Sequence, residues 1–148
     1  MKKMKKKHRK AFGYYVRWIA DEMGLRDWRF EIEWREPEEV DEVEGHVRGA
    51  SCEPVPGRRV ATLGFGEHLR EVDPEDLRET VVHELIHCHL AALWAQLRQD
   101  LLNPLGQETY NAFIASSERN MEFGVDALAA ALAKHMPLIE WDNTGEDE

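Results

Sequence analysis

The chain has 148 residues, a net charge of −10 at pH 7 and 43% hydrophobic residues, a composition that supports one compact domain with a core. Its two cysteines, Cys52 and Cys88, are too few for a disulfide framework and fit a reducing cytoplasm, although a single bridge between them stays open. No run approaches the roughly 18 apolar residues of a membrane span, and no apolar segment follows the basic start, so neither a membrane anchor nor a secretory signal is expected.

The first ten residues, MKKMKKKHRK, form a strongly basic arm. Seven of them are lysine or arginine, so the remainder holds 12 basic and 29 acidic residues, a net charge of −17. A body this acidic repels phosphates, so a nucleic acid could be bound only through the arm. We expect residues 1–10 to form a solvated, disordered arm and residues 138–148 to form a short acidic tail.

The next part of the chain predicts a helix and a small sheet. Residues 11–24 carry apolar side chains at helical spacing, and Gly24 ends this pattern. The segment DWRFEIEW, at 27–34, alternates apolar and charged residues with the period of a half-buried strand. Two shorter strands are expected at 46–54 and 58–66, joined by the turn-forming VPG. Together these segments predict a mostly antiparallel sheet.

Two helical regions follow. A long run extends from Asp73, a good N-cap residue, through Pro74 at the first helical position to the NPLG break at 103–106. The second region covers about 107–135. The order helix, strands, helix, helix predicts a single α+β domain over residues 11–137, with helices against a small sheet.

The first of these helices contains an HExxH motif within RETVVHELIHCHLAAL, at 78–93. His83 and His87 lie one turn apart on the same face, where two ring nitrogens can bind one Zn²⁺ at about 2.0–2.1 Å. Glu84 lies beside that position, so it can take a proton from metal-bound water and pass it to a leaving amine. We therefore predict one zinc ion held by His83 and His87, with Glu84 as the catalytic base.

The third zinc ligand has to come from elsewhere in the chain. His89 is two residues after His87, about 200° around the helix, so it should point away from the metal. Cys88 is about 100° off the ligand face, and we interpret it as a packed core residue. Position 93 is leucine, which excludes the short motif with a third histidine six residues past His87.

The second helical region offers two carboxylates near its apolar stripe, Glu118 and Glu122. A carboxylate on the buried side of a helix is costly unless it is paired or metal-bound. Asp126 lies one turn after Glu122, and such a pair can divide two tasks: one carboxylate binds zinc while the other accepts the N–H of a ligating histidine. We favour Glu122 over Glu118 as the third ligand, with Asp126 supporting a histidine; the alternative is that one or both glutamates are solvated.

The sequence resembles the zincin metallopeptidases, and more narrowly the gluzincins, in which HExxH is followed by an ExxxD helix; the matching residues are His83, Glu84, His87, Glu122 and Asp126. The segment EFGVDALAAAL, followed by a proline, is similar to the third-ligand helix of the ImmA/IrrE-like peptidases. The layout over residues 11–137 also resembles small zincin-like proteins of phages and bacteria. The DNA-binding repressor module that commonly accompanies ImmA/IrrE-like proteins is not visible.

This resemblance implies a zincin-like fold and a zinc peptidase that hydrolyses a protein or peptide substrate. It assigns His83, His87 and Glu122 to the metal and the base role to Glu84. In zincins an edge strand before the metal helix holds the substrate, and the segment at 58–66 is the candidate here. No residue stands out as the group that stabilises the oxyanion; the candidates are Tyr110, His89 and His135.

Two other functions stay open. One is a non-catalytic zinc-binding interaction protein, against which the intact Glu84 speaks because a structural site needs no base and is normally closed by four protein ligands. The other is a nucleic-acid-associated protease of the SprT type, guided by the basic arm. The sequence sets neither the substrate nor the oligomeric state.

Overall fold

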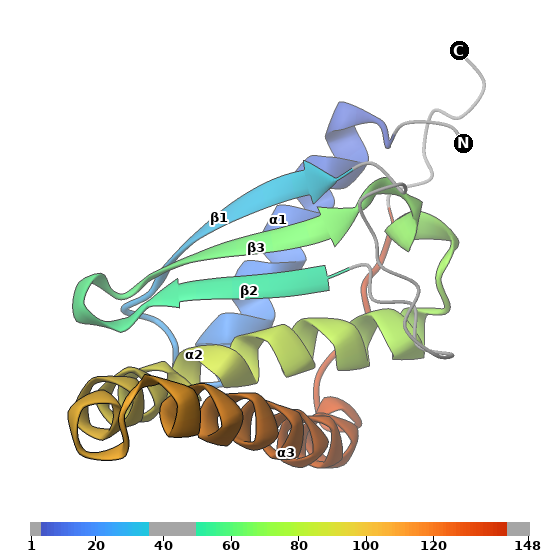
Figure 1. Ribbon diagram of the computed structural model, residues 1–148. Coiled ribbons are helices and arrows are strands. Elements are labelled where there is room, and N and C mark those ends of the chain that lie inside the picture. The colour runs from blue at the N-terminus through green and yellow to red at the C-terminus, as the bar shows by residue number, and fades with distance from the viewer. Residues whose placement is uncertain (1–3, 36–49, 142–148) are drawn as a thin grey trace.

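The computed structural model describes residues 4–35 and 50–141, which form an α+β fold of three helices and a three-stranded sheet (Figure 1). This confirms the predicted class and order of elements. Parts of the predicted strand at 46–54 and of the tail at 138–148 lie outside the described residues. The elements are α1 (Lys6–Glu22), β1 (Arg29–Arg35), β2 (Ala50–Val55), η2 (Pro56–Arg58), β3 (Val60–Gly66), η3 (Glu67–Glu71), α2 (Pro74–Leu105) and α3 (Gln107–Ala133).

Helix α1 begins at Lys6, five residues earlier than predicted. The Met4 backbone N–H donates to Glu67 at 2.9 Å, and the Arg9 guanidinium pairs with the same carboxylate at 2.5 Å. His8 is buried, with its ring edge-on to Trp141 at 6.0 Å between centroids. The prediction of a disordered arm is therefore wrong for residues 4–10, because long-range contacts order a segment that composition alone assigns to solvent.

The ends of α2 have clear local causes. Asp73 caps the helix by accepting the Glu75 backbone N–H at 2.8 Å, and Pro74 occupies the first turn, as predicted. The helix continues past the predicted break and includes Pro104. It stops at Gly106, whose φ of +72° favours glycine. Because α3 starts at the next residue, α2 and α3 form a tight antiparallel hairpin (Figure 1).

The sheet has the order β1–β3–β2, so β3 lies in the middle. Leu63 of β3 lies opposite Ile32 in the parallel pairing with β1, and opposite Cys52 in the antiparallel pairing with β2. The prediction of a mostly antiparallel sheet is wrong, because one of the two pairings is parallel. The short η2 connection makes β2 and β3 antiparallel, and β3 then lies between β2 and β1 and follows the direction of β1.

One face of the sheet carries α1 and α2, and α3 packs on α2 (Figure 1). The Phe12 ring of α1 meets Phe65 of β3 at 4.8 Å between centroids, while Cys52 of β2 meets Cys88 of α2 at 3.7 Å between sulfurs. Residues two apart in a strand, and residues opposite each other in neighbouring strands, share a face, so both contacts belong to one core. No helix in the described part of the chain is both long and apolar enough to cross a bilayer.

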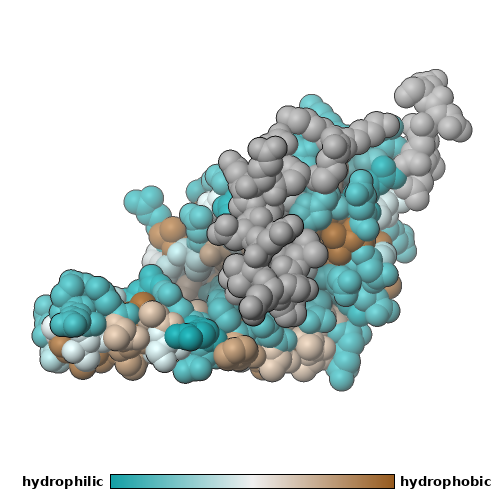
Figure 2. Space-filling view, turned by 45° about the vertical axis from the view of Figure 1, so that its right-hand side comes forward, coloured by the Kyte–Doolittle hydropathy of each residue, from teal (hydrophilic) through white to brown (hydrophobic). Residues whose placement is uncertain are grey.

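The outer halves of α2 and α3 form a two-helix arm. Between Ala91 in α2 and Val125 in α3, no side chain of these helices is buried in the described structure. In the space-filling view this arm projects from the rest of the molecule (Figure 2). The HExxH residues lie on the α2 turns just before the arm begins, where α2 contacts the sheet, α1 and α3.

The end of the domain is held by a buried tyrosine, which gives the fold a testable pH dependence. The Tyr15 hydroxyl donates to the Pro137 carbonyl at 2.9 Å, and burial, partly offset by the charge of Arg78, raises the pKa of Tyr15 to about 12. Between pH 10 and 12 the unfolded chain therefore binds fewer protons than the folded chain, so stability falls as pH rises. From pH 9 to pH 11 we expect wild type to lose about 1 kcal/mol more unfolding free energy than Tyr15→Phe in urea titrations. Equal losses would contradict this account.

Candidate metal centre

Helix α2 brings two imidazoles together. Residues four apart on a helix lie on one face, and the Nε2 atoms of His83 and His87 are 3.2 Å apart. Both side chains are partly buried, with exposed fractions of 20% and 17%. The predicted shared face of the two histidines is confirmed.

A carboxylate from α3 completes the group. Glu122 places Oε2 at 3.3 Å from Nε2 of His83 and Oε1 at 3.5 Å from Nε2 of His87. These three residues each offer a donor atom within 4.8 Å of the others. Glu118 instead pairs with Arg98 of α2, so of the two predicted alternatives it is Glu122 that lies beside the histidines.

The donor spacing fits a small tetrahedral ion. With bonds of about 2.0–2.1 Å, neighbouring ligand atoms around a tetrahedral zinc are about 3.3 Å apart. The two histidine Nε2 atoms are 3.2 Å apart, which matches this value, and each lies 3.3 or 3.5 Å from a different oxygen of Glu122. Two imidazoles and one carboxylate are also a donor set that zinc uses. The chain thus offers a possible metal site formed by His83, His87 and Glu122.

Asp126 contacts the other nitrogen of His83. Its Oδ1 is 2.9 Å from Nδ1 of His83, while Nε2 faces Glu122 and His87. A hydrogen on Nδ1 donated to Asp126 leaves the Nε2 lone pair available to a metal and fixes the ring. The structure therefore places Asp126 where the sequence predicted a supporting carboxylate.

Asp126→Asn tests this support. The amide replaces a charged acceptor with a neutral one, so zinc affinity should fall about 10- to 100-fold. Competition with a chromophoric chelator measures this change. Asp126 is 60% exposed, so the metal-free variant should unfold at the same temperature as metal-free wild type. A zinc affinity equal to that of wild type would show that the contact between Asp126 and His83 does not contribute to zinc binding.

Negative charge surrounds the site. Burial alone would lower the pKa of His83, but the hydrogen bond with Glu122 and the charges of Glu84, Glu122 and Asp126 outweigh it and raise that pKa. Burial lowers the pKa of His87, and Glu122 opposes this shift only in part. The same field that retains a proton on His83 favours a divalent cation at the shared position.

Glu84 is buried, with 6% of its surface exposed, and lies on the side of α2 that meets β2. Cys88 is one turn further along the same face and contacts Cys52 of β2. The hydrogen bond with Cys88, then burial and nearby charges that include Glu84, raise the pKa of Cys52. The charge of Glu84 raises the pKa of both His83 and Cys52, so this carboxylate lies within electrostatic range of both residues.

The three candidates for an oxyanion-stabilising group lie elsewhere. His89 places Nε2 at 2.9 Å from the Met23 carbonyl, so it faces the end of α1, as its angle on α2 predicts. Tyr110 precedes Glu122 by twelve residues in α3, about 18 Å along the axis. His135 follows the end of α3, which is itself about 17 Å past Glu122. The oxyanion roles considered for these three residues are not supported by their positions.

The hairpin geometry contains a signal for the third ligand that sequence reasoning did not use. Residues equally distant from the turn of an antiparallel helix pair face each other. His87 is 19 residues before Gly106, so its counterparts lie near position 125, between Glu122 and Asp126. Glu118 lies nearer the turn, where it meets Arg98.

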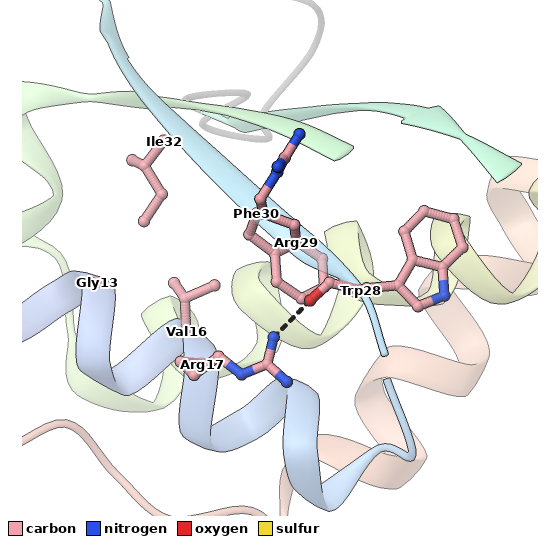
Figure 3. A pocket seen from close by; sticks show the side chains of 7 residues that line it. All are labelled: Gly13, Val16, Arg17, Trp28, Arg29, Phe30 and Ile32. Carbon is pink, nitrogen blue, oxygen red and sulfur yellow. Dashed lines mark hydrogen bonds between the residues drawn. The ribbon is translucent and has the colours of Figure 1, made fainter. Parts of the chain in front are cut away.

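A hollow of about 440 Å³ between α1 and β1 is separate from this site (Figure 3). Arg17 lies at its wall and donates to the Trp28 carbonyl at 2.5 Å, and the Trp28 and Phe30 rings are stacked. None of the candidate metal residues lines it; its lining is Gly13, Val16, Arg17, Trp28, Arg29, Phe30 and Ile32. The hollow and the α2–α3 metal group are thus separate features of the fold.

No protein-family model, no curated protein and no solved structure matches this chain.

Proposed function

We propose that the protein is a zinc-dependent metallopeptidase with a zincin-like arrangement of the gluzincin type. The observation that carries the proposal is the convergence of donor atoms of His83 and His87 from α2 and of Glu122 from α3 within 4.8 Å of one another, with Glu84 next to His83 in the sequence of α2. No fourth histidine, cysteine or carboxylate joins this group among residues 4–35 and 50–141. Three protein ligands leave a coordination position for water or substrate, which is typical of catalytic rather than structural zinc sites.

A bound zinc ion would lower the pKa of a water molecule at the open position and polarise the carbonyl of a peptide bond. Glu84 is the residue that takes the proton from the attacking water and later gives it to the amine that leaves. Glu84 is buried, and its charge acts on His83, which supports its assignment as the base. Asp126 holds the His83 ring, and the partial burial of both histidines limits competition from solvent water.

The substrate strand is the part of the proposal that the fold revises. The predicted edge segment, 58–66, forms β3, which pairs on both sides and offers no free edge. Instead β2 is an edge strand that packs against α2 at Cys88, one turn after Glu84. A peptide in extended form adding to β2 would lie alongside the metal centre. Proline lacks a backbone N–H, so Pro54 limits the donors that this edge provides.

Zinc content and proteolysis together test the function. We expect about one zinc per purified chain, loss of zinc in His87→Ala, and cleavage of an unfolded protein such as casein that stops on chelation and returns with zinc. Folding of His87→Ala is checked by circular dichroism. A zinc-loaded protein that cleaves neither casein nor a mixed peptide library would contradict the peptidase proposal and favour a zinc-binding interaction protein.

A further inference from the structure

Two thiols face each other where β2 meets the metal helix. The sulfurs of Cys52 and Cys88 are 3.7 Å apart, and both cysteines are free. Cys88 directly follows His87 and lies one turn after Glu84. We propose that Cys52 and Cys88 form a redox modification site, at which oxidation makes a reversible disulfide that joins β2 to α2 and lowers the activity of the metal centre. The regulatory half of this inference rests on the proposed peptidase function, whereas the cross-link itself does not.

The contact is well placed for a bond. A disulfide has an S–S length of about 2.05 Å, so the two sulfurs need to approach by about 1.7 Å. Cys52 lies on the edge strand β2, where it pairs with Leu63 of the central strand, and its sulfur contacts α2. Cys88 of α2 is buried in the hydrophobic core. Each thiol thus belongs to a different element, and the bond would close a loop of more than thirty residues between β2 and α2.

A small oxidant has a route to the pair. Cys52 is only partly buried. Cys88, although 3% exposed, forms part of the wall of a hollow of about 350 Å³. The other residues lining this hollow are Gly24, Leu25, Asp27, Trp28, Arg59 and His89. Hydrogen peroxide is small enough to enter a space of this volume. The reaction needs no protein cofactor.

The chemistry balances with peroxide as the oxidant. The thiolate of one cysteine attacks a peroxide oxygen, the O–O bond breaks, and one water leaves, which gives a sulfenic acid. Because the pKa of Cys52 is raised, this step is slow at neutral pH, and the oxidation is followed with excess peroxide. The second sulfur then attacks the sulfenic sulfur, the S–O bond breaks, and a second water leaves as the S–S bond forms. The two thiols lose two protons and two electrons, and one hydrogen peroxide takes them up to become two waters. A small thiol reductant such as dithiothreitol reverses the bond by exchange.

The bond would act on the metal centre through α2 and β2. Drawing Cys88 toward β2 shifts the turn of α2 that carries His87 and Glu84, and it fixes the edge strand proposed to receive the substrate. Displacement of catalytic groups by about 1 Å can cost on the order of 100-fold in rate. We expect peroxide to lower kcat/KM for casein-derived peptides by at least about tenfold, with zinc still bound because neither thiol is a ligand.

The test uses the zinc-loaded, reduced wild-type chain treated with hydrogen peroxide and then with a thiol-alkylating reagent. Intact-mass measurement should show a monomer that has lost two hydrogens and takes up no alkyl group, and peptide mapping should find the Cys52–Cys88 link. The cross-link should raise the unfolding temperature by on the order of 10 °C, because it constrains the unfolded chain. Dithiothreitol should restore the mass, the unfolding temperature and the rate of hydrolysis.

Cys52→Ala is the matched control. It cannot form the link, so a sulfenic-acid probe such as dimedone should label Cys88, and the unfolding temperature should not rise with peroxide. Two alkylatable thiols remaining in wild type, under peroxide that fully oxidises a reference dithiol, would overturn the site, as would a covalent dimer. Equal hydrolysis in the reduced and cross-linked states would overturn the regulation. Absence of hydrolysis in both states would refute the proposed function and leave the mass result to decide the thiol assignment.

Discussion

Glu84→Gln should retain zinc and lose peptide hydrolysis. Glutamine has nearly the same shape as glutamate, but its amide cannot accept the proton of the attacking water. General-base catalysis of this kind contributes about 10²- to 10⁴-fold, so kcat/KM should fall by at least about 100-fold. The loss should appear in kcat, because Glu84 is not assigned to substrate binding or to the metal. Metal analysis and initial rates on one preparation measure both halves of this expectation.

Glu79→Gln is the control for this experiment. Glu79 lies on the same helix, is exposed, and makes the same change of charge when it is replaced. Its rate and zinc content should match those of wild type. Hydrolysis by Glu84→Gln at the wild-type rate would show that Glu84 is not the catalytic base. Loss of zinc in this variant would show that Glu84 is a metal ligand.

Glu122→Gln should weaken zinc binding far more than Glu118→Gln. The first replacement removes the anionic donor beside His83 and His87, and loss of a ligand should exceed the 10- to 100-fold cost of losing a supporting contact. The second breaks the partly exposed pair with Arg98, which is worth at most about 1 kcal/mol and lies away from the histidines. Chelator competition on both variants gives the comparison directly.

The two variants carry the same chemical change one turn apart on one helix, so differences in expression or overall charge cancel. Circular dichroism and thermal unfolding check that α3 is intact in each. If Glu118→Gln lost zinc as severely as Glu122→Gln, the third ligand would have to be reassigned. If neither lost zinc, the carboxylate of α3 would not be part of the metal centre.

Local features were predictable because their causes lie within a few residues. The start of α2 follows from a capping side chain at Asp73 and a proline at the next position. The shared face of His83 and His87 and the outward direction of His89 follow from 100° per residue on a helix. The alternating pattern of β1 likewise needs only the strand period.

The third member of the metal group needed more than the local pattern. Glu118 and Glu122 lie on nearly the same face of α3, so helical periodicity could not separate them strongly. The register of the α2–α3 hairpin, set by the turn at Gly106, separates them by bringing Glu122 to the histidines and Glu118 to Arg98. The sequence contained this information as the number of residues that separates each glutamate from the turn at Gly106.

The errors share one physical cause. The sheet order, which makes β3 central and leaves β2 as the edge beside α2, depends on where a later strand inserts between earlier ones. The folded position of residues 4–10 depends on contacts with Glu67 and Trp141, which are far away in the chain. Neither the hydrophobic period nor the local charge records such contacts.

The sequence by itself determined the helical HExxH element, its start and the chemistry its side chains can perform, because these depend on residue types at fixed short spacings. Only the tertiary structure showed Glu122 beside the histidines and Glu118 beside Arg98, β2 as the strand against α2, and Cys52 in contact with Cys88 between them. Each of those pairings joins different elements of the fold, and such contacts are set by how whole elements pack against one another.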